Sequence, residues 1–285
     1  MYKQPGVSER PVTYREVDLN GGLINDLVFI HGGTCSDVSG AFPVVAAGAT
    51  VCFAGADISS MTVSGTVRAV SSSVLSGTFI GHTFGGLSVC SGCTVIDTSV
   101  YEGGNLDVRE GAVASGTVLG YFGHMTVSSG GLASDTKVKG GMMTVCRGAE
   151  VSVLDIGGGG TVNIETNAHV SEVVVDSGGT VYIGASLACD RMYDPDEETC
   201  SYLYISAGGY AEVMDNRTIV ENVYVSSGGS MRVKSGCVAN SVCLKKGAEL
   251  TVESGGTVLC LYGQGSAGLI ANQGAKIFYR NGKEN

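Results

Sequence analysis

Short segments in which apolar and polar residues alternate run along most of this chain. Examples are Val162-Asn163-Ile164, Val181-Tyr182-Ile183 and Met231-Arg232-Val233. Alternation with a period of two, in β-branched residues, predicts strands. No stretch has apolar residues at i, i+3, i+4 and i+7 over enough length for a helix, and the 45 glycines would each oppose a helix by about 1 kcal/mol relative to alanine. The pattern therefore predicts an all-β protein.

Glycines separate these segments at a regular interval. The turns that end at Gly104, Gly123, Gly141, Gly160 and Gly179 follow one another at steps of 18 or 19 residues, each divided into a short and a long arm. Self-similarity at about 20 residues indicates a solenoid. The period is too short for helical repeats, and the leucine and asparagine spacing of leucine-rich repeats is missing. We therefore predict a single-domain parallel β-helix, a β-solenoid with about 19 residues per coil.

The repeat has a physical reason. One short strand cannot bury its apolar side chains alone, but the same unit in the coils on either side completes its hydrogen-bond ladder and its core. We expect the solenoid to occupy residues 17–280 in roughly fourteen coils about 4.8 Å apart, and to be right-handed like most crossover connections. Residues 1–16 are expected to be a lead-in or cap, and residues 281–285 a polar tail.

Composition and charge exclude two classes of partner. The net charge is −10 and the sequence pI is about 4.8, so the chain has no basic stripe with which to bind nucleic acid. The longest apolar run is far shorter than the ~20 residues that a membrane-spanning helix needs.

The turn segments resemble a known family. Val175-Asp176-Ser177-Gly178-Gly179, Val225-Ser226-Ser227-Gly228-Gly229 and Val252-Glu253-Ser254-Gly255-Gly256 are similar to the strand-loop-strand repeats of AIDA-type autotransporter adhesin passengers. The resemblance covers about residues 80–260. It implies the β-helical stalk of a bacterial surface or secreted adhesin, whose partners would be surface glycans or proteins of a host or another bacterium. Self-association is a further expectation, because uncapped end coils expose unpaired ladders.

The location follows from the same resemblance. The segment Met1–Arg10 contains no apolar signal-peptide core, so either the chain is intracellular or a leader has been removed. We expect an extracellular or cell-surface protein, with a cytoplasmic location as the alternative.

An enzyme is the alternative function, because parallel β-helices also include polysaccharide lyases and glycoside hydrolases that gather two or three carboxylates on one face. We expect the acidic residues outside the insertion described next to be scattered rather than to recur at one coil position, and the histidines to lie near turns without an acidic partner. The sequence therefore predicts no catalytic residues. The acids concerned are Asp97, Asp107, Asp135, Asp155, Asp176 and Glu212; the histidines are His31, His82, His124 and His169.

One insertion interrupts the period. The interval from Gly179 to Gly209 is 30 residues, and the excess lies in an acidic loop at about residues 187–201. Insertions in solenoids form loops on one face, often a binding face. The alternative is a solvated loop that binds no partner. The candidate binding residues are Asp190, Arg191, Tyr193, Asp194, Asp196, Glu197 and Glu198.

Two cysteines, Cys189 and Cys200, bracket this loop, and we expect a disulfide between them that stabilises the fold by about 2 to 3 kcal/mol. The carboxylates of the loop could supply oxygen ligands for Ca²⁺, but they lack the ordered spacing and central glycine of an EF-hand loop, so we expect no metal and no other cofactor. Cysteines at strand positions, namely Cys52, Cys90, Cys146 and Cys260, are expected to be buried as small apolar residues.

Overall fold

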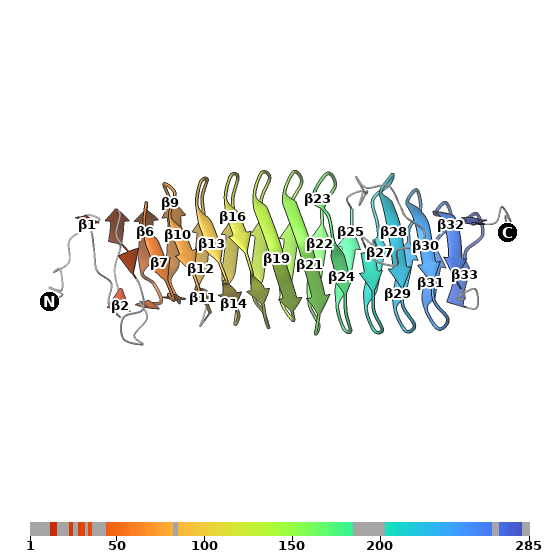
Figure 1. The fold of residues 1–285 in the computed structure, drawn as a ribbon, viewed down its shortest axis with the longest axis horizontal. Helices are drawn as coiled ribbons and strands as arrows, with labels where there is room; N and C mark the ends of the chain where they lie inside the picture. Colours follow the sequence, from red (N-terminus) through yellow and green to blue (C-terminus); the bar gives the residue numbers. More distant parts are fainter. Residues whose placement is uncertain are drawn as a thin grey trace.

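A computed structural model describes residues 12–15, 23–24, 28–31, 34–35, 44–81, 85–184, 203–263 and 268–280, the first four of these ranges by their backbone alone. These residues form a rod of stacked strands with β1 and β33 near opposite ends (Figure 1). No α-helix occurs among them. The described strands pair in parallel, which confirms the predicted parallel β-solenoid.

One side of the rod is a 14-stranded parallel sheet to which each coil contributes one strand. Residues paired at one position in successive coils form what we call a column, and neighbours in a column are mostly 18 to 20 residues apart. The strands of this sheet are β1 (Val12–Arg15), β3 (Val28–His31), β6 (Thr50–Ala54), β9 (Thr66–Val70), β12 (Gly86–Val89), β15 (Asn105–Val108), β18 (His124–Val127), β20 (Met142–Val145), β22 (Thr161–Ile164), β25 (Thr180–Ile183), β27 (Tyr210–Val213), β29 (Ser230–Val233), β31 (Glu249–Val252) and β33 (Leu269–Ala271).

The second sheet has 20 strands and consists of two ladders that meet at a bend. Along each coil, the upstream ladder comes first and contains β4 (Thr34–Cys35), β7 (Asp57–Ser59), β10 (Val74–Ser76), β13 (Thr94–Ile96), β16 (Val113–Ser115) and β23 (His169–Val170). The downstream ladder contains β2 (Leu23–Ile24), β5 (Val44–Val45), β8 (Thr62–Val63), β11 (Phe79–Ile80), β14 (Ser99–Val100), β17 (Val118–Leu119), β24 (Val173–Val175) and β26 (Leu203–Ile205). The remaining strands are β34 (Lys276–Tyr279), and five that run through the bend: β19 (Leu132–Lys139), β21 (Glu150–Gly157), β28 (Ile219–Val225), β30 (Val238–Leu244) and β32 (Thr257–Gly263).

The bend is made by residues with left-handed backbone conformations. In β19 and β21 these are Asp135 (φ 48°) and Val153 (φ 55°), and in coils whose strands stop at the bend Asp97 (φ 51°) and Gly116 (φ 68°) occupy the same column. The alternation of inward and outward side chains breaks there, since Ser152 and Val153 are both exposed. The bend directs the two ladders along different sides of the rod.

The core consists of apolar columns that run through the interior. Val89, Val108, Val127 and Val145 pair in succession, and none of them is exposed to solvent. Fully burying such a side chain contributes about 1.5 to 3 kcal/mol. Each coil therefore depends on its two neighbours for the burial of its apolar residues.

The glycine pairs at the turns have two separate reasons, as Gly178-Gly179 illustrates. Gly178 has φ 76°, a conformation that glycine adopts without steric cost. Gly179 has no such φ, but a Cβ atom there would collide with the carbonyl oxygen of Ile156 in the preceding coil. A positive φ and a close backbone approach thus each require a glycine at this turn.

Candidate binding groove

The predicted recognition loop lies outside the described residues. Asp190, Arg191, Tyr193, Asp194, Asp196, Glu197, Glu198 and the cysteines Cys189 and Cys200 all fall between β25 and β26. The loop, its ligands and its disulfide therefore remain predictions.

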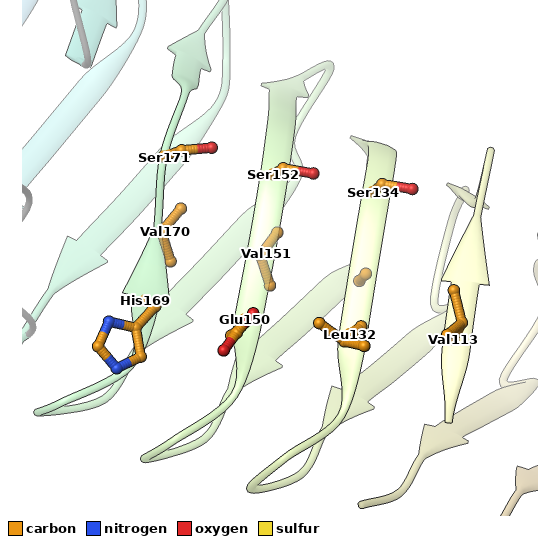
Figure 2. Close-up of a pocket in the computed structure, with 10 residues that line it drawn as sticks. Val113, Leu132, Ser134, Glu150, Val151, Ser152, His169, Val170 and Ser171 are labelled. Atoms are coloured by element: carbon orange, nitrogen blue, oxygen red, sulfur yellow. The ribbon is translucent and has the colours of Figure 1, made fainter. Parts of the chain in front are cut away.

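A groove with a volume of about 610 Å³ lies elsewhere, on the upstream ladder across β16, β19, β21 and β23 (Figure 2). One wall is the column Val113, Leu132, Glu150 and His169; the other includes Ser134, Ser152 and Ser171. Residues two apart on a strand point to the same face, so both walls project outward from the same strands. The four coils span about 14 Å along the rod axis.

The two walls differ in chemistry. Ser134 Oγ donates a hydrogen bond to Ser115 Oγ over 3.1 Å, so one further hydroxyl group extends the serine wall into the preceding coil. On the other wall, Leu132 keeps 39% of its surface exposed, and Glu150 and His169 are exposed neighbours in the same column. The groove thus offers hydroxyl donors and acceptors on one side, and apolar and ionisable groups on the other.

This arrangement does not form a catalytic group. Figure 2 shows the His169 imidazole directed away from the hydroxyl groups of Ser152 and Ser171, with the valines between them. No hydrogen bond between described residues joins an imidazole to a serine hydroxyl. Nor does any group of three or more His, Cys, Asp or Glu side chains among the described residues come together in a way that could hold a metal ion.

The acidic residues outside the loop are largely scattered, with two corrections. Asp107 and Glu212 occupy one column of the 14-stranded sheet, five coils apart, so the expectation that no acids share a coil position is wrong for them. It is also wrong for Asp97 and Asp135, which occupy the same bend column, two coils apart with Gly116 between them. Aspartate is one of the few side chains that tolerate the left-handed conformation required there. Their alignment therefore follows from the bend.

Two histidines lie near turns as predicted, but His169 has an acid, Glu150, beside it in the same column. His124 and His169 are exposed and each is the first residue of a strand, directly after a turn. His31 ends β3, and His82 lies outside the described residues.

The prediction of the cysteine environments is wrong. Cys52, Cys90 and Cys146 are half-buried and Cys260 is exposed, whereas Cys93 and Cys237, which follow turn glycines, are buried. Cys93 occupies the column of Ala112 and Ala149, where the chain leaves the turn and the side chain enters the core. Cys52 stands instead at an outward position of β6, and Cys90 and Cys146 directly follow their strands. Cys260 lies at the bend in β32, with a left-handed φ of 52°.

A polar network on the 14-stranded sheet was not predicted from the sequence. Tyr210 Oη donates a hydrogen bond to Glu212 over 2.6 Å, and Lys234 Nζ lies 2.7 Å from the other carboxylate oxygen. Burial disfavours the ionised Glu212, which is 8% exposed, but the hydrogen bonds from Lys234 and Tyr210 outweigh it and hold the pKa of Glu212 below its ordinary value. Burial, followed by the hydrogen bond to Glu212 and its charge, raises the pKa of Tyr210. With its charge compensated, this carboxylate is suited to a structural role.

These features define the chain as a parallel β-solenoid repeat protein with a lateral groove. No protein-family model and no curated protein sequence matches it. Within the described residues, no helix has the length and apolar character needed to cross a membrane.

Among solved structures, the chain is similar to a TibC-catalysed, hyper-glycosylated fragment of TibA. The TM-score is 0.66 at 21% identity over 94% of this chain and 96% of that fragment. At this identity the similarity shows a shared fold. The catalytic unit of a thermostable GH87 α-1,3-glucanase from Streptomyces thermodiastaticus strain HF3-3 also matches, at 14% identity over 93% of this chain and 61% of the glucanase. Its TM-score of 0.27 is too low to carry an argument.

Proposed function

We propose that the chain is a non-enzymatic repeat module of a bacterial surface or secreted protein, which mediates adhesion by binding glycans or proteins along the side of its rod. The observation that carries this proposal is the groove, which is open and lies parallel to the rod axis across four coils. The fold shared with the TibA fragment and the resemblance of the turns to adhesin passengers both support it.

The columns give the groove a simple binding mechanism. An extended ligand parallel to the axis would meet a similar group at every coil, at a spacing of about 4.8 Å. Serine hydroxyls both donate and accept hydrogen bonds, and Leu132 adds apolar contact. Each contact is weak, so affinity would come from several contacts on one rod and from several rods on one surface.

Adhesion can be tested with beads coated with the purified chain, whose retention is measured on immobilised glycans and extracellular matrix proteins. Ser152→Tyr would fill the groove and is expected to reduce retention. Ser254→Tyr, at an exposed turn away from the groove, is the matched control and should leave retention unchanged. Equal retention of both variants would remove the groove from the proposal.

The enzyme alternative has its own assay. Incubation with acidic polysaccharides and with α-1,3-glucan should give no new reducing ends and no unsaturated products. Turnover that purifies with the chain would contradict the non-enzymatic function.

A further inference from the structure

The turn between β17 and β18 carries an exposed aromatic pair. Tyr121 and Phe122 retain 70% and 75% of their surface, the highest fractions among the large hydrophobic residues that the structure describes. The next highest value is 57%, for Ile270 in the last described coil. Single exposed apolar residues are common on proteins, but two adjacent exposed aromatic rings at the tip of a turn are a distinct feature.

Phe122 is also held in an unfavourable backbone conformation. Its φ is 58°, which is an outlier for a bulky side chain. In eight other coils the same position, two residues before the strand of the 14-stranded sheet, is a glycine with positive φ: Gly48, Gly103, Gly140, Gly159, Gly178, Gly208, Gly228 and Gly247. The fold at this position favours glycine, and stability alone does not account for phenylalanine. A strained residue at a position where glycine would relieve the strain is a reason to look for a function.

Neighbouring coils extend the aromatic surface along the rod. The ring of Tyr101 stacks on Phe79, with 5.9 Å between the ring centres and 12° between the planes. It also lies over Gly120, where a Cβ atom would collide with it, and the ring of Tyr121 lies close to Gly140, where a Cβ atom would make a tight contact at 3.2 Å. Two glycines thus provide space for aromatic rings from the preceding coils. We call Tyr101, Tyr121 and Phe122 the aromatic edge.

We propose that the aromatic edge binds the pyranose rings of a neutral glycan by stacking. The C–H groups on one face of a pyranose form an apolar surface that packs on the negative face of an aromatic ring. A neutral ligand suits a chain with a net charge of −10, which would repel an acidic polymer.

The size of the surface also favours a glycan over a folded protein partner. Two fully covered aromatic rings bury about 300 to 500 Å², whereas a stable protein interface buries about 800 Å² on each partner. Stacking along the edge supplies weak contacts of the kind that become effective when many rods meet one surface. This inference rests on the proposed adhesive function and names a ligand class for it, at a site other than the groove.

The decisive variant is Phe122→Gly, because a structural and a binding role predict opposite results. Glycine matches the other coils and relieves the strain, so the unfolding midpoint should rise by about 2 to 4 °C. The same change removes a stacking ring, so binding of a neutral oligosaccharide should weaken about tenfold. A variant that is more stable but binds less tightly would be the expected outcome.

Asn167→Gly is the matched control. Asn167 is exposed and has φ 61°, but it lies at the turn before β23, away from the aromatic edge. This substitution also replaces a left-handed residue by glycine and should leave oligosaccharide binding unchanged. Tyr121→Ser, which does not change a strained position, should weaken binding without raising the unfolding midpoint.

The measurement is calorimetric titration of the purified chain with soluble neutral hexasaccharides of glucose, galactose and mannose at millimolar concentration. No binding by the unmodified chain, equal binding by Phe122→Gly, or a lower unfolding midpoint for that variant would each overturn the inference. Phe122→Gly could reduce bead retention on protein surfaces without changing oligosaccharide binding in any titration. In that case the edge contacts proteins and the glycan assignment is wrong. Bead retention that persists in Phe122→Gly but is lost in Ser152→Tyr would overturn the aromatic edge and leave the proposed function standing.

Discussion

Four threonines form a buried column at the bend of the solenoid, and their hydroxyl groups have no hydrogen-bond partner among the described residues. The column is Thr78, Thr98, Thr117 and Thr136, and none of these residues is more than 1% exposed. The next residue in the column is Leu154, followed by Val173. The fold thus accepts apolar side chains at this position, which makes Thr98→Val and Thr117→Val the informative substitutions.

The expected effect is a gain in stability. Burying a hydroxyl group without a partner costs about 1 to 3 kcal/mol, and valine has nearly the shape of threonine without that group. We expect each substitution to stabilise the fold by about 1 kcal/mol, which corresponds to about 2 to 4 °C in the unfolding midpoint of a chain of this size. Because the two threonines are neighbours, the double variant need not equal the sum of the single ones.

Ser73→Ala is the control, because this buried serine is fully bonded. Its hydroxyl lies 2.8 Å from the carbonyl oxygen of Val70 and 3.1 Å from that of Phe53, and it accepts a bond from the Ala56 amide over 3.2 Å. Its removal should destabilise the fold by about 1 to 3 kcal/mol. Thermal and denaturant unfolding, followed by circular dichroism, would measure the expected gain in stability of the threonine variants and the expected loss in Ser73→Ala. If Thr98→Val and Thr117→Val lower the midpoint, the hydroxyls have partners, such as buried water, and the reasoning is refuted.

Three further outcomes are expected. Gly179→Ala should destabilise the fold by about 1 to 3 kcal/mol in the same unfolding assay, because its Cβ has no room beside the preceding coil; an unchanged midpoint would contradict this. Because the pKa of Glu212 is lowered in the folded state, its contribution to stability is present above its ordinary pKa of 4.5 and is lost as the pH falls below that value. Unfolding midpoints of Glu212→Gln should therefore depend less on pH over that acidic range, while Lys234→Met should shift the loss towards higher pH. Intact mass after alkylation without reductant should show Cys189 and Cys200 protected, and alkylation of both would disprove their disulfide.

The periodicity of the sequence predicted the fold because stacking imposes the same demand on every coil. A glycine at each turn and a β-branched pair in each arm have local causes, so they can be recognised without knowing which residues pair. The orientation of individual side chains could not be predicted across a turn or bend. Cys93 enters the core, although it directly follows a turn glycine, and Ser152 and Val153 break the alternation at the bend. A residue with a left-handed backbone conformation changes which of the following side chains face the core. The alternation of apolar and polar residues does not reveal which residues adopt that conformation.

The groove was missed for a different reason. The residues of each wall recur at the same position in successive coils. The regular spacing of Leu132, Glu150 and His169 was therefore already present in the sequence. A search for clustered acids and metal ligands does not find a surface made of hydroxyl and apolar columns. To find such a surface, the outward-facing positions of a solenoid have to be compared along each column. Every residue type, and not only acids and metal ligands, has to be considered as a possible contact for a ligand.

Phe122 is the clearest case in which such a comparison adds information. Two residues before the strands of the 14-stranded sheet the sequence has glycine in eight coils, whereas Ser64, Phe84 and Phe122 depart from it. Local propensity does not explain the phenylalanine at 122. In a repeat protein the other coils act as internal controls, because they show which residue the backbone favours at each phase. A departure that lowers stability and exposes an aromatic ring is better explained by a binding role than by folding. If Phe122→Gly is less stable than the unmodified chain, that inference from the repeat is wrong.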